Sequence, residues 1–176
     1  MVFLAGMVCC LPALAQYSSK APEKKFEIDF GLGFPDLLHA GMKYKLSESS
    51  KIGMSYGALI APGGSRGRRM SAITLEHEYH FGKTSGKSSM PLYFFGQKLT
   101  YIQDVDELSS SETVYFTPYI GKGFYSEGPF GINIDLGLNF KIHDQTMAHI
   151  ESDNRNASSS FPGVFPAMRL QFFFEF

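Results

Sequence analysis

Acidic and basic side chains recur at alternate positions along much of this chain. Glu76 and Glu78 are two residues apart, so a β-strand would place both carboxylates on one face, where paired carboxylates can carry general acid–base chemistry. The acids and bases that share this alternation are Glu27, Asp29, Lys43, Lys45, Glu76, Glu78, Lys98, Asp135, Lys141, Arg169 and Glu175, with His39 and His80 beside them. Six acids against five bases are nearly balanced. We therefore interpret the set as paired structural charges and predict no catalytic residue.

Histidine, glycine and cysteine motifs give little support to other chemistry. His77 and His80 have the spacing H-x-x-H, but an odd spacing on a strand points the two rings to opposite faces, which disfavours a shared metal ion. Gly31-Leu32-Gly33 is a lone G-x-G with no helix predicted after it. Both cysteines, Cys9 and Cys10, lie in the first fifteen residues. The sequence therefore predicts neither a metal site nor a cofactor.

The elements that carry these side chains are long alternating segments. Each has about ten residues or more and is bounded by Gly, Ser, Pro, Asn or Asp, a length that suits a tilted membrane-spanning strand, whereas globular strands are nearer 5–6 residues. There are eight of them, at residues 25–34, 36–47, 51–61, 69–82, 90–104, 112–124, 129–143 and 163–176.

Each segment has one apolar face and one face of glycine and charge. Between residues 130 and 142 every even position is apolar, and the odd positions hold Gly, Asn, Asp and Lys. A β-sandwich would place the apolar faces inward, and a membrane barrel would place them outward. We favour the barrel because the glycines suit a crowded lumen and aromatic residues end many apolar faces, as in membrane interfacial girdles. The pattern predicts an all-β fold, an eight-stranded antiparallel up-and-down transmembrane β-barrel whose lumen is filled by charged side chains and is not an open pore.

Four residues depart from this pattern. His77, Gln97 and Lys122 have the parity of the apolar face, and Pro118 falls in the middle of its segment. Lys122 lies near a strand end, where a charge facing lipid costs little. Gln97 requires a bulge or a register change if it is to avoid lipid.

The first fifteen residues differ from the rest of the chain. They carry no charge and end in Ala13-Leu14-Ala15, a small-residue cleavage pattern, so residues 1–15 are predicted to be a signal peptide. Residues 16–176 would then form a single barrel domain without cysteine. The net charge of −1 does not indicate a nucleic-acid partner.

The end of the chain carries a family resemblance. Apolar residues occupy every second position up to a terminal phenylalanine, at Met168, Leu170, Phe172, Phe174 and Phe176. This run resembles the C-terminal strand of bacterial outer-membrane proteins, which the barrel-assembly machinery recognises. With the signal peptide and the eight segments, the whole mature chain resembles small eight-stranded barrels such as the membrane domain of outer-membrane protein A.

The resemblance implies a location in the bacterial outer membrane, contact with outer-membrane lipid and lipopolysaccharide, and a monomer with a structural or surface-interaction role. Both termini would face the periplasm. The connections at 34–36, 61–69, 103–112 and 143–163 would then face outward. Arg66, Arg68 and Arg69 in the second of these could contact phosphate groups of lipopolysaccharide, or could be ordinary solvated loop charges.

Two alternative functions remain open. Some small outer-membrane barrels are lipid A-modifying enzymes, and the deacylases among them carry His-x-Ser on one strand. No histidine of this chain is followed two residues later by serine, so we predict that the protein is not an enzyme. The other alternative is a small-solute channel.

Overall fold

The computed structural model describes residues 24–60, 69–84, 90–105, 109–126, 128–148 and 163–176. The predicted signal peptide at 1–15, both cysteines, Arg66 and Arg68 lie outside these residues. Among the described residues, no helix is long and apolar enough to cross a membrane.

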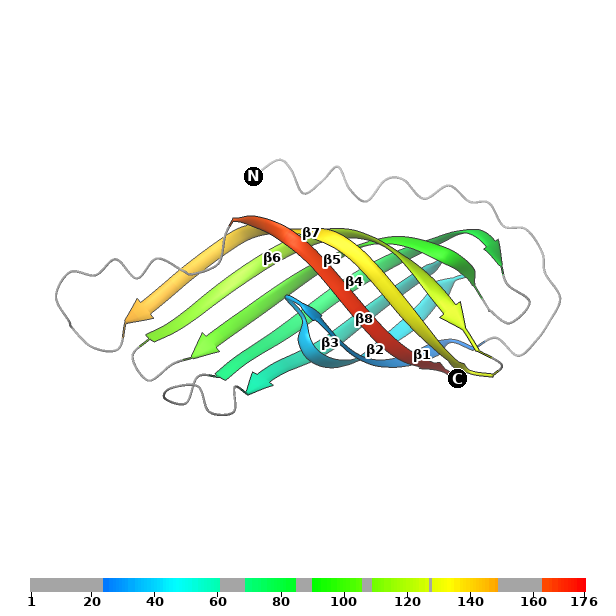
Figure 1. Cartoon of the computed structure of the whole chain (residues 1–176), viewed down its shortest axis with the longest axis horizontal. Helices are drawn as coiled ribbons and strands as arrows, with labels where there is room; N and C mark the ends of the chain where they lie inside the picture. Colours follow the sequence, from blue (N-terminus) through cyan, green and yellow to red (C-terminus); the bar gives the residue numbers. More distant parts are fainter. Residues whose placement is uncertain (1–23, 61–68, 85–89, 106–108, 127, 149–162) are drawn as a thin grey trace.

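The chain folds into one closed sheet of eight antiparallel strands in sequence order (Figure 1). The last strand pairs with the first, so each strand has a partner on both sides, and a two-sheet sandwich is excluded. The predicted fold class, an all-β, eight-stranded antiparallel up-and-down barrel, is confirmed. The strands are β1 (Phe26–Phe34), β2 (Leu37–Ser47), β3 (Ser50–Ile60), β4 (Arg69–Thr84), β5 (Pro91–Val105), β6 (Ser109–Tyr125), β7 (Phe130–Ala148) and β8 (Val164–Glu175).

Exposure alternates along the strands with a period of two, as strand geometry requires. On β1, Phe30 and Leu32 are each 58% exposed, whereas Glu27 and Asp29 between apolar neighbours are each 1% exposed. The usual distribution of a globular protein is thus inverted, with large apolar side chains on the outside and charged side chains buried in the lumen.

The strands are staggered around the barrel. A walk from one hydrogen-bonded partner to the next does not return to its starting residue, which is the geometry of tilted strands in a closed sheet. Starting at Phe34 on β1, the partners are Met168, Leu136, Ile120, Phe95, Tyr79, Ser50 and Ser47. Ser47 lies past Tyr44, the partner of the first residue of β1.

Several strands are longer than the sequence predicts. β6 begins at Ser109 and β7 continues to Ala148, and these ends pair from Ser109–Ala148 to Val114–His143. The predicted connections 103–112 and 143–163 are therefore too long. The polar composition of both ends is typical of a loop, yet main-chain hydrogen bonding continues beyond the regular apolar alternation, which ends at Ile142 on β7.

The register around Gln97 corrects another expectation. β4 and β5 pair without interruption from Arg69–Val105 to Phe81–Tyr93, so neither a bulge nor a register change moves Gln97. Its partners are His77 on β4 and Pro118 on β6. Pro118 has no N–H to donate, and the pairing of β6 with β7 omits it.

The turn between β1 and β2 is folded into the barrel. In Figure 1 this blue tip ends well short of the ends of β6 and β7. Asp36 is 1% exposed, and Leu37 packs against Met70, Ile102 and Tyr115 inside the wall. Leu37 has φ of 63°, a conformation that a non-glycine residue adopts only when its surroundings impose it. The connection at 34–36 is therefore a buried turn and not an exposed loop, and the side of the membrane that it faces stays a prediction.

Glycines inside the barrel make room for aromatic rings on the neighbouring strand. Gly131 pairs with Phe173, and a β-carbon on Gly131 would lie 2.1 Å from the Phe173 ring. The pairs Gly96–Tyr119 and Gly121–Phe94 repeat this arrangement. The glycines of the polar faces thus let large rings lie across the lumen.

Candidate functional site

The structure brings most of the predicted charged set together in the lumen. Nine members are buried: Glu27, Asp29, Lys43, Glu76, Glu78, Lys98, Asp135, Arg169 and Glu175. Lys45 and Lys141 are only partly buried. Lys141 pairs with Asp144 at 2.8 Å near the far end of β7. We call the nine buried residues, together with Asp36, Lys51, Tyr119 and Gln171, the lumen network.

Lys43 on β2 is the centre of one part of the lumen network. Its Nζ lies 2.6 Å from Glu78 Oε1 and 3.2 Å from Glu76 Oε1, so the two β4 carboxylates share one ammonium. Gln171 Oε1 of β8 accepts a further hydrogen bond from the same Nζ at 3.3 Å. Three strands are thereby tied across the interior, and the Glu76–Glu78 pair is held by counter-charge.

Arg169 on β8 is the second centre. Its Nε donates to Asp135 Oδ2 at 2.7 Å, and its Nη2 lies 2.7 Å from Glu76 Oε2. The guanidinium also lies 5.3 Å from the centre of the Tyr119 ring, a cation–π distance. The Tyr119 hydroxyl donates to Glu76 Oε2 at 3.1 Å, which links this part of the network to the Lys43 part.

Lys51 fills the end of the lumen nearest the chain terminus. Its Nζ lies 2.5 Å from Glu27 Oε2 and 3.1 Å from Glu175 Oε1. Sequence reasoning missed Lys51, although it alternates correctly with Gly53, Ser55 and Gly57, because it stands at the edge of its segment.

Asp36, at the tip of the β1–β2 turn, extends the lumen network at the end of the lumen opposite Lys51 and Glu175. Its carboxylate pairs with Lys98 of β5 and accepts a hydrogen bond from Thr74 Oγ1 at 2.9 Å. Arg169 Nη1 is 3.9 Å away. No local signal marks Asp36 as buried, because its partners lie on β4, β5 and β8 and are distant in sequence.

Acids exceed bases among the buried groups. Lys45 and Lys141 lie outside the fully buried set, whereas Asp36 belongs to it, so the near balance predicted from sequence does not hold. Buried carboxylates among the described residues number seven, against four buried cationic side chains: Glu27, Asp29, Asp36, Glu76, Glu78, Asp135 and Glu175, with Lys43, Lys51, Lys98 and Arg169. One oxygen each of Glu27, Asp29 and Asp135 accepts no hydrogen bond within the described part of the chain.

Histidines occupy both faces of β4, as the spacing predicts. His80 faces the lumen, where Nε2 lies 3.4 Å from Glu78 Oε2 and Nδ1 lies 3.0 Å from the Pro91 carbonyl oxygen. His77 faces outward, and its Nε2 lies 2.8 Å from Ser50 Oγ. Within the described residues, no group of three or more His, Cys, Asp or Glu is placed to hold a metal ion.

Gln97 and Lys122, the other two polar residues with the parity of the apolar face, lie on β5 and β6. Gln97 is the direct neighbour of His77 across β4 and β5 and is partly exposed. Lys122 has its Nζ 5.3 Å from the centre of the Tyr93 ring and 5.0 Å from that of Phe124. These two rings at the strand ends hold the ammonium of Lys122 by cation–π contact.

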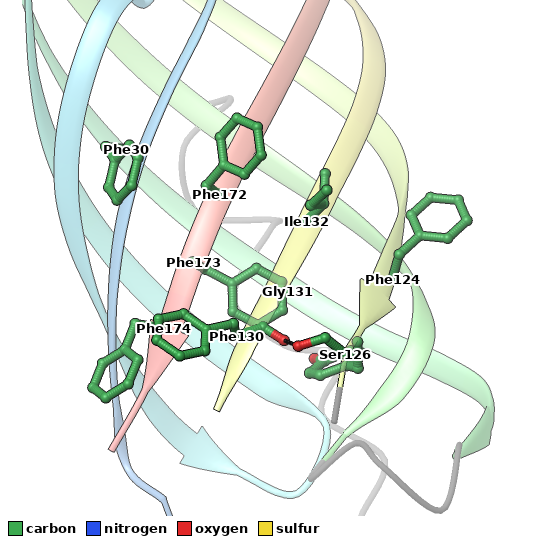
Figure 2. Close-up of a pocket in the computed structure, with 10 residues that line it drawn as sticks. Phe30, Phe124, Ser126, Phe130, Gly131, Ile132, Phe172, Phe173 and Phe174 are labelled. Carbon is green, nitrogen blue, oxygen red and sulfur yellow. Dashed lines mark hydrogen bonds between the residues drawn. The ribbon is translucent and has the colours of Figure 1, made fainter. Parts of the chain in front are cut away.

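An apolar cavity of about 500 Å³ opens between the ends of β6, β7 and β8 (Figure 2). Phe124, Phe130 and Phe172 line it, with Phe30 of β1 on the opposite side. Ser126 supplies one of few polar groups, and its Oγ donates to the Phe130 carbonyl oxygen at 3.0 Å. The lining suits hydrocarbon.

The predicted assembly strand forms the closing strand β8. Met168, Leu170, Phe172 and Phe174 point outward along it, and Phe176 follows directly. The Phe176 ring stacks on Phe26 and Phe174 at 5.9 and 6.0 Å. Arg69, the one described member of the arginine loop, is exposed at the start of β4.

The fold and the lumen network define a class of protein, the closed eight-stranded β-barrel with an apolar exterior and a buried, charged interior. Neither a protein family nor a curated protein sequence matches this chain. Among solved structures, the chain is similar to the crystal structure of Acinetobacter baumannii CarO, with 9% sequence identity and a TM-score of 0.43. The alignment covers 88% of this chain and 98% of that one.

Proposed function

We propose that this protein is a bacterial outer-membrane barrel with a structural or surface-interaction role. The observation that carries the proposal is the inverted distribution of side chains. Apolar residues such as Leu38, Met54 and Phe130 are 67%, 60% and 58% exposed, while Lys43 and Arg169 are buried. An apolar surface around a whole barrel is unfavourable in water and favourable in lipid, and closure leaves no strand edge unpaired.

The lumen is proposed to be filled and not to conduct. Lys43, Arg169 and Tyr119 meet carboxylates from β4 and β7 across the interior, and the β1–β2 turn adds Asp36 and Leu37. An eight-stranded barrel has an interior only wide enough for side chains. Ion pairs that join strands across this space support a plug and a rigid scaffold.

Contacts outside the lumen follow from the same placement. Lipid surrounds the apolar belt, and the arginines at 66, 68 and 69 contact lipopolysaccharide phosphate where the barrel meets the outer leaflet. The alternating apolar run that ends at Phe176 is the segment that the barrel-assembly machinery binds during insertion. Each contact is a proposal that rests on residue chemistry and on the resemblance.

A heat-modifiability gel, which compares the mobility of unboiled and boiled protein, tests the membrane placement. The full chain is refolded from urea into detergent or phosphatidylcholine vesicles and run with and without boiling. A closed barrel that needs an apolar solvent migrates faster unboiled, and only when detergent or lipid is present. Efficient folding in plain buffer would contradict the proposal.

Planar-bilayer recording separates the scaffold from the small-solute channel. The filled lumen predicts no stable conductance steps, and regular steps from the native chain would favour the channel.

A lipid A-modifying enzyme is favoured by one observation, the contact of Ser50 Oγ with His77 Nε2 on the outer face. A serine hydrolase also needs a group that orients the histidine and donors for the oxyanion. The contacts of His77 within the described residues include no carboxylate. Loss of lipid A deacylation on Ser50→Ala would establish the enzyme, and we expect the native chain to show no such activity.

A further inference from the structure

The outer face of the barrel is asymmetric in polarity. Along β1 and β8, along β2 as far as Leu46 and along β7 as far as Ile142, every described outward side chain is apolar or aromatic. Polar side chains enter the middle of the outer face only on β4 and β5 among the described residues, at His77 and Gln97. If lipid were the sole neighbour, nothing would favour this one-sided placement.

Gln97 is the residue whose hydrogen bonds are missing. His77 directs its Nε2 to Ser50, whereas the Gln97 amide has no hydrogen-bond partner among the described residues. Its neighbours along β5 are Phe95 and Leu99, which are 54% and 44% exposed. An amide carries two donors and an acceptor, and hydrocarbon satisfies neither.

We infer that the outer face of β4–β6 binds a second copy of this chain, with Gln97 close to the two-fold axis. Two copies inserted in the same direction are related by an axis along the membrane normal, so every residue keeps its depth and a residue near the axis meets its own copy. The Gln97 amide is self-complementary, because its donors face the acceptor of the other copy. An apolar partner would leave the amide unpaired.

The surroundings of Gln97 allow this approach. Pro118, its direct partner on β6, is exposed and has a short ring in place of a long side chain. Ile120 and Leu75 on the flanking strands are 57% and 54% exposed and supply apolar area around the amide. The inference rests on the proposed membrane placement and replaces the monomer that the sequence predicts.

Disulfide crosslinking in vesicles tests the inference. The full chain carries Cys9→Ala and Cys10→Ala, and Leu99→Cys is added as the reporter beside an intact Gln97. Leu32→Cys on β1, four strands away in either direction, is the matched control on an apolar face. After oxidation in phosphatidylcholine vesicles, we expect a dimer from Leu99→Cys and little from Leu32→Cys.

Adding Gln97→Leu to the reporter tests the amide itself. Leucine suits lipid, so the barrel should fold, and dimer yield should fall by about three- to tenfold, the range of one polar contact within a membrane. Equal crosslinking at the two cysteine positions, or a yield unchanged by Gln97→Leu, would overturn the dimer and leave the membrane placement standing.

The unboiled gel shift of each variant separates the remaining outcomes. A chain that does not enter vesicles overturns both the membrane placement and the dimer. A crosslinked product of another mass in cells, without a homodimer in vesicles, assigns the surface to a different protein and overturns the second copy.

Discussion

The main-chain oxygen of Asp36 lies 2.0 Å from the position that a β-carbon on residue 57 would occupy. The β1–β2 turn can therefore fold into the barrel only because residue 57 is glycine. We expect Gly57→Ala to displace the turn and to lower the free energy of unfolding by about 1–3 kcal/mol, the usual cost of overpacking. Urea titration in vesicles measures the change. Gly163→Ala is the control, because nothing lies within 4 Å of its added β-carbon, and an equal loss there would contradict this account.

The Asp36–Lys98 ion pair can be tested independently. Asp36→Asn, Lys98→Met and the double variant form a double-mutant cycle between residues that are both buried. Because either single variant leaves a charge without its partner, we expect the two losses to be non-additive by more than about 1 kcal/mol. Additive losses would mean that the two side chains do not stabilise each other.

Lys43 neutralises two buried carboxylates, so its removal should destabilise the barrel. Lys43→Met leaves Glu76 and Glu78 without their shared ammonium, and removal of one partner of a buried ion pair costs about 3–5 kcal/mol. We expect the variant to fold in lower yield, with a lower urea midpoint. Lys83→Met, at an exposed position on the same barrel, is the matched control and should change little.

Phe176, which follows the last strand, is hydrogen-bonded to Phe26 at the start of the first strand. Its N–H donates to the Phe26 carbonyl oxygen at 2.9 Å, and its own carbonyl oxygen accepts from the Phe26 N–H at 3.1 Å. Phe176→Ala removes ring contacts worth about 0.5–1.5 kcal/mol each but keeps these main-chain bonds. We expect the barrel to stay stable once formed in vitro, while assembly in cells slows.

Phe130→Ala, which removes an exposed ring at the same rim, is the control for that prediction. Assembly in cells should be slower for Phe176→Ala than for Phe130→Ala, as measured by the appearance of the unboiled, fast-migrating form. Equal assembly rates would show that the terminal ring has no special role in recognition.

Alternation along the sequence predicts the strands and their two faces, because strand geometry places every second side chain on one face. The choice of a barrel over a sandwich also depends on the glycines of the polar faces and the aromatic residues that end the apolar faces. The faces of β1, β7 and β8 could be assigned by alternation, from runs such as Phe26 to Phe34. The ends of β6 and β7 could not, since residues such as Ser111 and Asp144 show no apolar alternation and form strands through pairing with Thr146 and Thr113 across the sheet.

The lumen network likewise contains residues that sequence alternation can locate and residues that it cannot. Residues within alternating runs, such as Glu76 and Arg169, could be located inside from sequence. Asp36 and the hub position of Lys43 could not, because they depend on contacts between strands far apart in the chain. Gln97 shows a different limit: its parity indicates the outer face correctly, and what sequence alone lacks is the reason for a polar group there.

The pairing of β8 with β1 has a consequence for biogenesis. The first strand and the last are each other's neighbours, so no fragment of the chain can complete the sheet. A chain that lacks β8 has two exposed strand edges, at β1 and β7. Along each edge strand, the main-chain N–H and C=O groups on one side have no strand to pair with. The sheet can therefore close only when β8 is present, and a chain truncated before β8 would keep both edges open to pairing with another strand.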